Sequence, residues 1–189
     1  MNRIKVTLLF LLVAAGLWAQ PLPRSTPEAE GVSSQNIINF LDAAATSDHE
    51  FHSIMILRHG KVVAEGWWNP YGPDLKHTMY SVSKSFTATA IGFAVSEKKL
   101  SVEDKVISFF PDETPNTVDA NLAALRVKHL LSMSVGQQPD PSGRVGRSEN
   151  WVRAFLNTPI IHEPGTKFLY NSVATYMLSA IVQKVTGQK

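Results

Sequence analysis

Apolar residues recur every three or four positions in two stretches of the chain, which is the pattern of a helix with one buried face. The first stretch runs from Ile37 to Ala44, and Ser33 or Ser34 before it is a suitable N-cap. We therefore expect a helix that ends near Ser47.

The end of the chain has the same pattern. Its apolar positions are Val173, Tyr176, Met177, Ala180, Ile181 and Val185. Gly187 follows them, and glycine is common just past the end of a helix. The sequence predicts an amphipathic helix from about residue 173 to 187.

Two runs between these helices are strand-like. Phe51–Leu57 and Val62–Trp67 are rich in β-branched and aromatic residues, and Arg58–Lys61 between them predicts a hairpin turn. An isolated hairpin is marginally stable in water, and no further convincing strand follows. We therefore expect the chain to be a fragment or truncated product of a longer domain.

The stretch Met79–Val95 is small and apolar, with hardly a charge. A helix that is apolar all round is typically buried. If this helix begins near Ser81, Lys84 lies one turn further along on the same face. An amine so placed can take a proton from the serine hydroxyl, which would make it a nucleophile.

Three shorter helices are expected. Ser101–Asp104 resembles a capping box that opens a helix through Phe109. Val127–Ser134 and Trp151–Leu156 are short apolar segments that favour helix.

Two loops carry residues that often contact substrates. In the loop 136–148, Arg144 and Arg147 either meet a substrate carboxylate or are solvated. In Trp67–Pro73, the aromatic rings either line a cleft or pack beneath the loop.

Residues 1–19 have the pattern of a cleaved secretory signal. Arg3 and Lys5 precede the apolar core Val6–Leu17, which is too short to span a bilayer. We expect an exported protein, periplasmic or secreted, that begins at Gln20.

The mature chain is expected to comprise a proline-rich arm, residues 20–32, and one domain, residues 33–189. Removing Arg3 and Lys5 balances its basic and acidic side chains. This argues against a nucleic-acid surface or a polybasic membrane patch.

Metal and cofactor chemistry finds little support. The absence of cysteine excludes disulfides, thiolate catalysis and cysteine zinc sites. His49 and His52 are spaced like metal ligands but have no third partner. There is no phosphate-binding glycine loop. We expect no metal and no cofactor.

The Ser-x-x-Lys spacing occurs twice, so the spacing alone is a weak signal. Ser96 and Lys99 close the predicted apolar helix in a polar run, whereas Ser81 and Lys84 open it. This context favours Ser81 as the nucleophile.

Three motifs occur in a fixed order: Ser81-Val82-Ser83-Lys84, His129-Leu130-Leu131-Ser132-Met133-Ser134 and Pro164-Gly165-Thr166-Lys167-Phe168-Leu169-Tyr170. As a set they resemble the serine β-lactamase superfamily, in its class C-like branch, which also holds penicillin-binding DD-peptidases and related esterases. The likeness runs from about Pro27 to Lys189. It implies an α/β (α+β) fold, with a helical region packed on an antiparallel sheet whose C-terminal strands are missing from these residues.

The resemblance also implies residue roles. Ser81 would attack a carbonyl carbon and form an acyl-enzyme, and Lys84 would activate it. Tyr170 would share proton transfer with Lys84 and return a proton to the leaving group. A cationic lysine beside a phenol favours the phenolate. From the residues alone, Tyr170 is equally a structural tyrosine.

This sequence departs from the family pattern in two places. The family has an asparagine two residues past the tyrosine, where this chain has Ser172, and its asparagine is Asn171. Either residue would contact the substrate, and the change weakens a β-lactam assignment more than an ester one. The third family motif is absent, because Lys184–Gly187 has an extra residue and lies at a predicted helix end.

We therefore predict a serine hydrolase that acts on a small-molecule or peptide-like acyl substrate, an amide or an ester, through a Ser81 acyl-enzyme. The alternatives are a carboxylic-ester hydrolase specifically and a non-catalytic binding module. No nucleic-acid partner and no stable membrane anchor are expected after signal cleavage. The missing strand would supply half the oxyanion hole, so we expect the chain alone to be nearly inactive.

Overall fold

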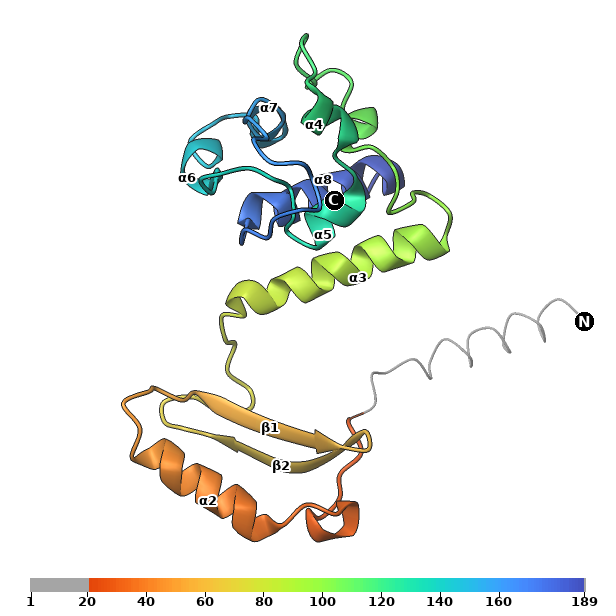
Figure 1. Ribbon diagram of the computed structural model, residues 1–189. Helices are drawn as coiled ribbons and strands as arrows, with labels where there is room; N and C mark the ends of the chain where they lie inside the picture. Colours follow the sequence, from red (N-terminus) through yellow and green to blue (C-terminus); the bar gives the residue numbers. More distant parts are fainter. Residues whose placement is uncertain (1–20, 189) are drawn as a thin grey trace, which may run out of the picture. The chain divides into compact units, whose positions relative to one another are not determined.

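The computed structural model describes residues 21–188, which form mixed α/β structure in two compact units (Figure 1). The chain passes from unit 1 to unit 2 between His77 and Thr78. The predicted signal, residues 1–19, lies outside the described residues. Among residues 21–188, no helix has the length and apolar character needed to cross a bilayer.

The described part of unit 1, residues 21–77, consists of a 3-10 turn, one α-helix and one hairpin. Its elements are η1 (Glu28–Glu30), α2 (Ser34–Ala45), β1 (Ser53–Arg58) and β2 (Lys61–Trp67). The predicted cap is confirmed, since the Ser33 side chain accepts a hydrogen bond from the Asn36 N–H. The predicted hairpin is also confirmed: β1 and β2 pair antiparallel, and His59 and Gly60 turn the chain with positive φ angles of 48° and 75°.

The proline-rich arm is fixed to the hairpin. The N–H and C=O of Val62 bond to Pro23 O and Ser25 N, at 2.8 and 3.0 Å. Glu30, which is buried, accepts a hydrogen bond from Lys61 Nζ at 2.7 Å and lies 3.1 Å from His59 Nδ1. Ionic and backbone bonds therefore hold the arm against the turn between β1 and β2.

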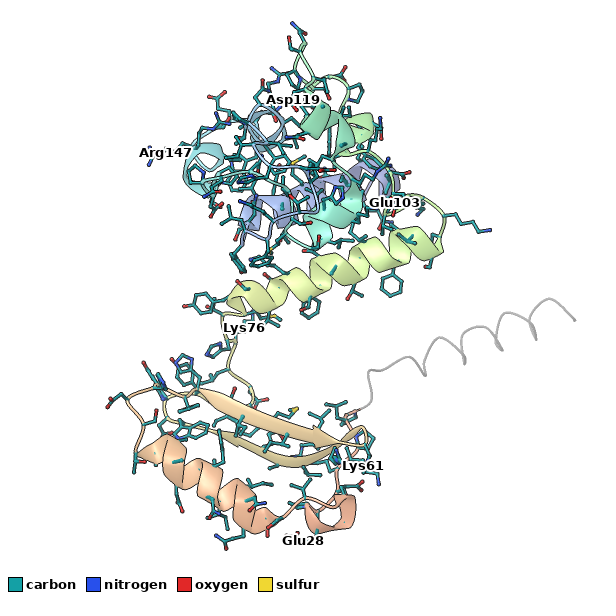
Figure 2. All side chains as sticks on the ribbon, viewed as in Figure 1. Glu28, Lys61, Lys76, Glu103, Asp119 and Arg147 are labelled. Carbon is teal, nitrogen blue, oxygen red and sulfur yellow. The ribbon has the colours of Figure 1, made fainter. Side chains whose placement is uncertain are left out.

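Unit 2 is helical. Its elements are η2 (Tyr80–Val82), α3 (Ser83–Ser96), η3 (Val106–Phe109), α4 (Ala120–Ala124), α5 (Val127–Leu131), α6 (Ser142–Val145), α7 (Trp151–Leu156) and α8 (Ser172–Thr186). The predicted helices at α3, α5, α7 and α8 are confirmed. The predicted capping-box helix is a 3-10 turn, η3. The sequence did not predict α4, where Asp119 lies (Figure 2), and it predicted a loop where the short helix α6 lies. Asp119 caps α4 by accepting from the Leu122 N–H.

The core of unit 2 is a continuous apolar cluster. It draws on α3, α5, α7 and α8 and includes Ile91, Leu130, Phe155, Met177 and Ile181. The prediction that α3 is buried all round is wrong, because only Ile91 and Ala94 of this helix are buried. One face of α3 packs on the core, while Phe86 and Phe93 are about two-thirds exposed at 64% and 65%.

Helices α3 and α8 run side by side in the same direction (Figure 1). Residues 86–90 of α3 line a groove with residues 176–183 of α8, and residues 90–99 line the next groove with residues 182–188. The N-termini of the two longest helices of unit 2 therefore lie at the same end.

Candidate active site

Ser81 lies in the η2 turn that leads directly into α3. Two features fix this turn. Ser83 Oγ donates to the Tyr80 carbonyl at 2.7 Å, and Tyr80 has a positive φ of 44°. A left-handed conformation is unfavourable for a bulky residue, and such strain is common next to functional groups.

Lys84 lies one helical turn beyond Ser81, as the sequence predicts. Its Nζ is 3.3 Å from Ser81 Oγ and donates to it. The side chain is half-buried, because one face of α3 packs on the core.

Tyr170 approaches the same hydroxyl from a distant part of the chain. Its OH lies 2.5 Å from Ser81 Oγ, and Lys84 Nζ lies 5.1 Å from the centre of its ring. Tyr170 remains 47% exposed. The structure therefore brings the three predicted catalytic residues together on an open surface of unit 2.

The environment of Tyr170 favours its phenolate. The hydrogen bond with Ser81, followed by the Lys84 amine, lowers the pKa of Tyr170 from its usual value of about 10, and the Ser172 hydroxyl adds to the effect. The N-termini of α3 and α8 also lie at this end. The positive ends of their dipoles favour negative charge there.

Ser172 and Asn171 have different positions. Ser172 is exposed, and its hydroxyl contributes to the lowered pKa of Tyr170. Asn171 is 1% exposed, its Oδ1 accepts from the Ala174 N–H, and its Nδ2 donates to Gln137 Oε1. These contacts do not support the expected substrate contact for Asn171. It is instead the N-cap of α8.

Neither the role of Gln137 nor the capping role of Asn171 was predicted from the sequence. An Asn directly before an apolar helix is a recognised cap signal, so Asn171 was open to prediction. Gln137 carries no such signal, because it lies in an irregular segment and only the fold buries it.

The other candidate side chains make local contacts. Arg144 donates to the carbonyl of Ala154 and to Thr158, which joins α6 to α7. Arg147 extends outward from the end of α6 (Figure 2). Within unit 1, His52 Nδ1 lies 2.5 Å from His77 Nε2 and its ring stacks on Tyr71. Residues 21–188 contain no group of three or more His, Asp or Glu able to hold a metal ion.

Comparison with known proteins identifies the family. The beta-lactamase family model matches residues 44–189. The chain belongs to the beta-lactamase family. The relatives matched in this family include proteins named as hydrolases, among them the 6-aminohexanoate-dimer hydrolase of Paenarthrobacter ureafaciens. It is 27% identical over 150 residues, which cover 71% of this chain and 38% of that protein.

Solved structures of the beta-lactamase family share the fold. A beta-lactamase/D-alanine carboxypeptidase from Pseudomonas syringae matches with a TM-score of 0.63 at 20% identity, over 82% of this chain and 45% of that one. EstCE1, a hydrolase with promiscuous acyltransferase activity, matches with a TM-score of 0.57 at 24% identity, over 72% and 42%. The chain spans less than half the length of each of these three relatives.

Proposed function

We propose that the protein is a serine hydrolase that forms an acyl-enzyme at Ser81. The observation that carries this proposal is the pair of contacts at one hydroxyl. Tyr170 OH lies 2.5 Å and Lys84 Nζ 3.3 Å from Ser81 Oγ. Both groups are within reach to take the hydroxyl proton, which is what a serine nucleophile requires.

In the proposed reaction, the proton of Ser81 passes to the Tyr170 phenolate, either directly or through a neutral Lys84 amine, as Oγ attacks the substrate carbonyl carbon. The carbonyl oxygen becomes an oxyanion, and the Ser81 N–H near the start of α3 is one donor for it. The intermediate collapses as Tyr170 returns the proton to the leaving group, which departs as an alcohol or an amine. A water molecule then attacks the Ser81 ester, releases the acid and restores the serine.

An ester is the substrate class that the site supports best. Asn171 is buried as a cap, so its carboxamide is not presented to a substrate amide. Ser172 offers only a hydroxyl in its place. The names of the relatives include a 6-aminohexanoate-dimer hydrolase and a beta-lactamase/D-alanine carboxypeptidase, so an amide substrate is the second candidate.

We further propose that the protein is exported. The support is the sequence pattern of residues 1–19, a basic start followed by a short apolar core.

Reaction with a fluorophosphonate probe tests the nucleophile. Because slow turnover is expected of these residues alone, the probe is given a prolonged incubation. We expect one adduct per chain, located at Ser81 by peptide mass spectrometry, which Ser81→Ala abolishes. Lys84→Ala should slow the reaction about a hundredfold or more, because it removes one proton-accepting group. Ser85→Ala, which lies next to Lys84 in α3, is the matched control and should react like the wild type.

The outcome also separates the rival class. A non-catalytic binding module would give no adduct at Ser81, and this result would overturn the proposal. A protein that gives the Ser81 adduct and that, in its unlabelled form, turns over short-chain nitrophenyl esters but neither amides nor β-lactams would establish the ester class.

A further inference from the structure

Two buried carboxamides lie behind Tyr170. Gln137 and Asn171 are 2% and 1% exposed, in a unit whose core is otherwise almost entirely apolar. Burying a carboxamide is unfavourable unless its polar atoms are hydrogen-bonded. Both side chains meet this requirement by bonding to each other and to the backbone.

The bonds form a chain with a fixed direction. The Ala174 N–H donates to Asn171 Oδ1 at 3.0 Å, Asn171 Nδ2 donates to Gln137 Oε1 at 3.0 Å, and Gln137 Nε2 donates to the Phe155 carbonyl at 3.3 Å. One end is a backbone N–H, which can only donate. The other end is a carbonyl, which can only accept. Both amide orientations are therefore determined, and the chain links the first turn of α8 to α7.

Tyr170 is held between two attachments to the segment 133–137. Before it, the Leu169 N–H donates to the Met133 carbonyl at 3.0 Å. After it, Asn171 is bonded to Gln137. The phenol is half-exposed, so packing of its own ring does little to hold it.

We propose that Gln137 is a positioning residue that acts through Asn171 to hold the Tyr170 hydroxyl against Ser81. Its consequence for the reaction rests on the proposed function. A contact of 2.5 Å depends on backbone placement, and a displacement of about 1 Å can cost about a hundredfold in rate. The bond from Ser81 is also the largest cause of the lowered pKa of Tyr170. Without it, the phenol should titrate closer to its usual value.

The test uses Gln137→Met, which removes both hydrogen bonds without adding charge. Gln138→Met is the matched control, because Gln138 is exposed and its side chain bonds to His162, at 3.0 Å, rather than to the segment that carries Tyr170. The first measurement is an ultraviolet titration of the phenol, with the Tyr170→Phe protein as the blank, which needs no activity. The second is the rate of fluorophosphonate labelling against pH.

We expect Gln137→Met to raise the pKa of Tyr170 and to slow labelling near neutral pH about tenfold or more. The labelling profile should shift to higher pH, and Gln138→Met should change neither measurement. Asn171→Ser provides a second test if Gln137→Met does not fold. Serine still caps α8 but is too short to reach Gln137, so the same shifts are expected.

An unchanged Tyr170 titration in folded Gln137→Met or Asn171→Ser would overturn the positioning role. The positioning role would also be overturned if labelling fell only in proportion to the fraction of folded protein while its pH profile stayed the same. If the wild type gives no Ser81 adduct but the titration still shifts, the positioning holds and only the proposed function fails.

Discussion

The two units of this protein differ in what holds them together. Unit 2 has a continuous apolar core, whereas the buried apolar residues of unit 1 are only Ala44, Val62 and Val63 among those described. Unit 1 relies on the hairpin ladder and on the bonds of Glu30. The Ser81, Lys84 and Tyr170 cluster lies wholly within unit 2, so the stable core and the candidate chemistry coincide.

The difference arises from how many apolar side chains each unit buries. Unit 1 has apolar side chains, but Ile38, Phe40, Met55 and Leu57 are all between 44% and 47% exposed. Hydrophobic stabilisation scales with the apolar area removed from water. Unit 2 buries apolar side chains on several helices, whereas unit 1 buries them at few positions.

The largest effect should come from core deletion in unit 2. Phe155→Ala removes a fully buried ring and should lower the free energy of unfolding by about 3–5 kcal/mol. Met55→Ala in unit 1 removes a half-exposed side chain and should change it by less than about 1 kcal/mol. Hydrogen exchange, followed separately for residues 21–77 and 78–188, reports each unit.

Equal losses of protection from these two substitutions would contradict the comparison. So would a loss in Phe155→Ala that is confined to residues 21–77.

A matched pair of glycines should give the next largest effect. Gly136 in unit 2 has a φ of 90°, and a Cβ there would lie 2.1 Å from the His162 carbonyl oxygen. Gly136→Ala should cost more than about 2 kcal/mol, because a steric clash adds to the left-handed strain. Gly60 in unit 1 has a φ of 75° with nothing within 4 Å, so Gly60→Ala should cost only about 1–2 kcal/mol.

Denaturant unfolding of both variants measures these costs. Should Gly60→Ala be the more damaging change, the packing around Gly136 would be less tight than the structure indicates. Gly136→Ala should also slow Ser81 labelling, because Gly136 lies in the segment that holds Tyr170.

The smallest expected effects are on the pH dependence of stability, which should differ between the two units. In unit 1, the bond from Lys61, then those from Ser25 and His59, lower the pKa of Glu30 from 4.5 to about 2. A lowered carboxyl pKa stabilises the fold at pH values above that of the unfolded group. Unit 1 should therefore keep this stability above pH 4.5 and lose it as the pH falls towards 2. Glu30→Gln should be less stable near neutral pH and should lose this acid dependence.

Unit 2 should respond at higher pH. Burial, followed by the nearby Lys128 and Arg126 charges, lowers the pKa of His129 from 6.5. The unfolded state then binds the proton more tightly, so stability should begin to fall as the pH drops below 6.5. His129 Nδ1 accepts from the Arg126 N–H at 3.1 Å, and His129→Gln keeps an acceptor at this capping position. Hydrogen exchange of unit 2 in that variant should lose its dependence on pH in this range, and an unchanged dependence would exclude His129 as its source.

Local patterns allowed much of the fold to be predicted. The Ser33 cap, the hairpin turn at His59 and Gly60, and the end of α8 at Gly187 depend on neighbouring residues, so a sequence reading finds them. The spacing of Ser81 and Lys84 is local in the same sense, since one helical turn brings them together. The placement of Tyr170 was predicted only through the family resemblance, because 89 residues separate it from Ser81.

Two predictions were wrong because they depended on which partners the fold supplies. The apolar composition of α3 suggested burial all round, but composition does not say how many faces of a helix find partners. Asn171 had the residue type of a substrate contact, and the fold used it as a cap.

The sequence by itself determined helices α2, α3, α5, α7 and α8, the hairpin and the Ser81–Lys84 pair, because each follows from contacts within a few residues. The tertiary structure alone decided that Tyr170 meets Ser81, that Gln137 is buried behind it, and that unit 2 rather than unit 1 holds the core. These features depend on contacts between residues far apart in the chain, which no local pattern specifies.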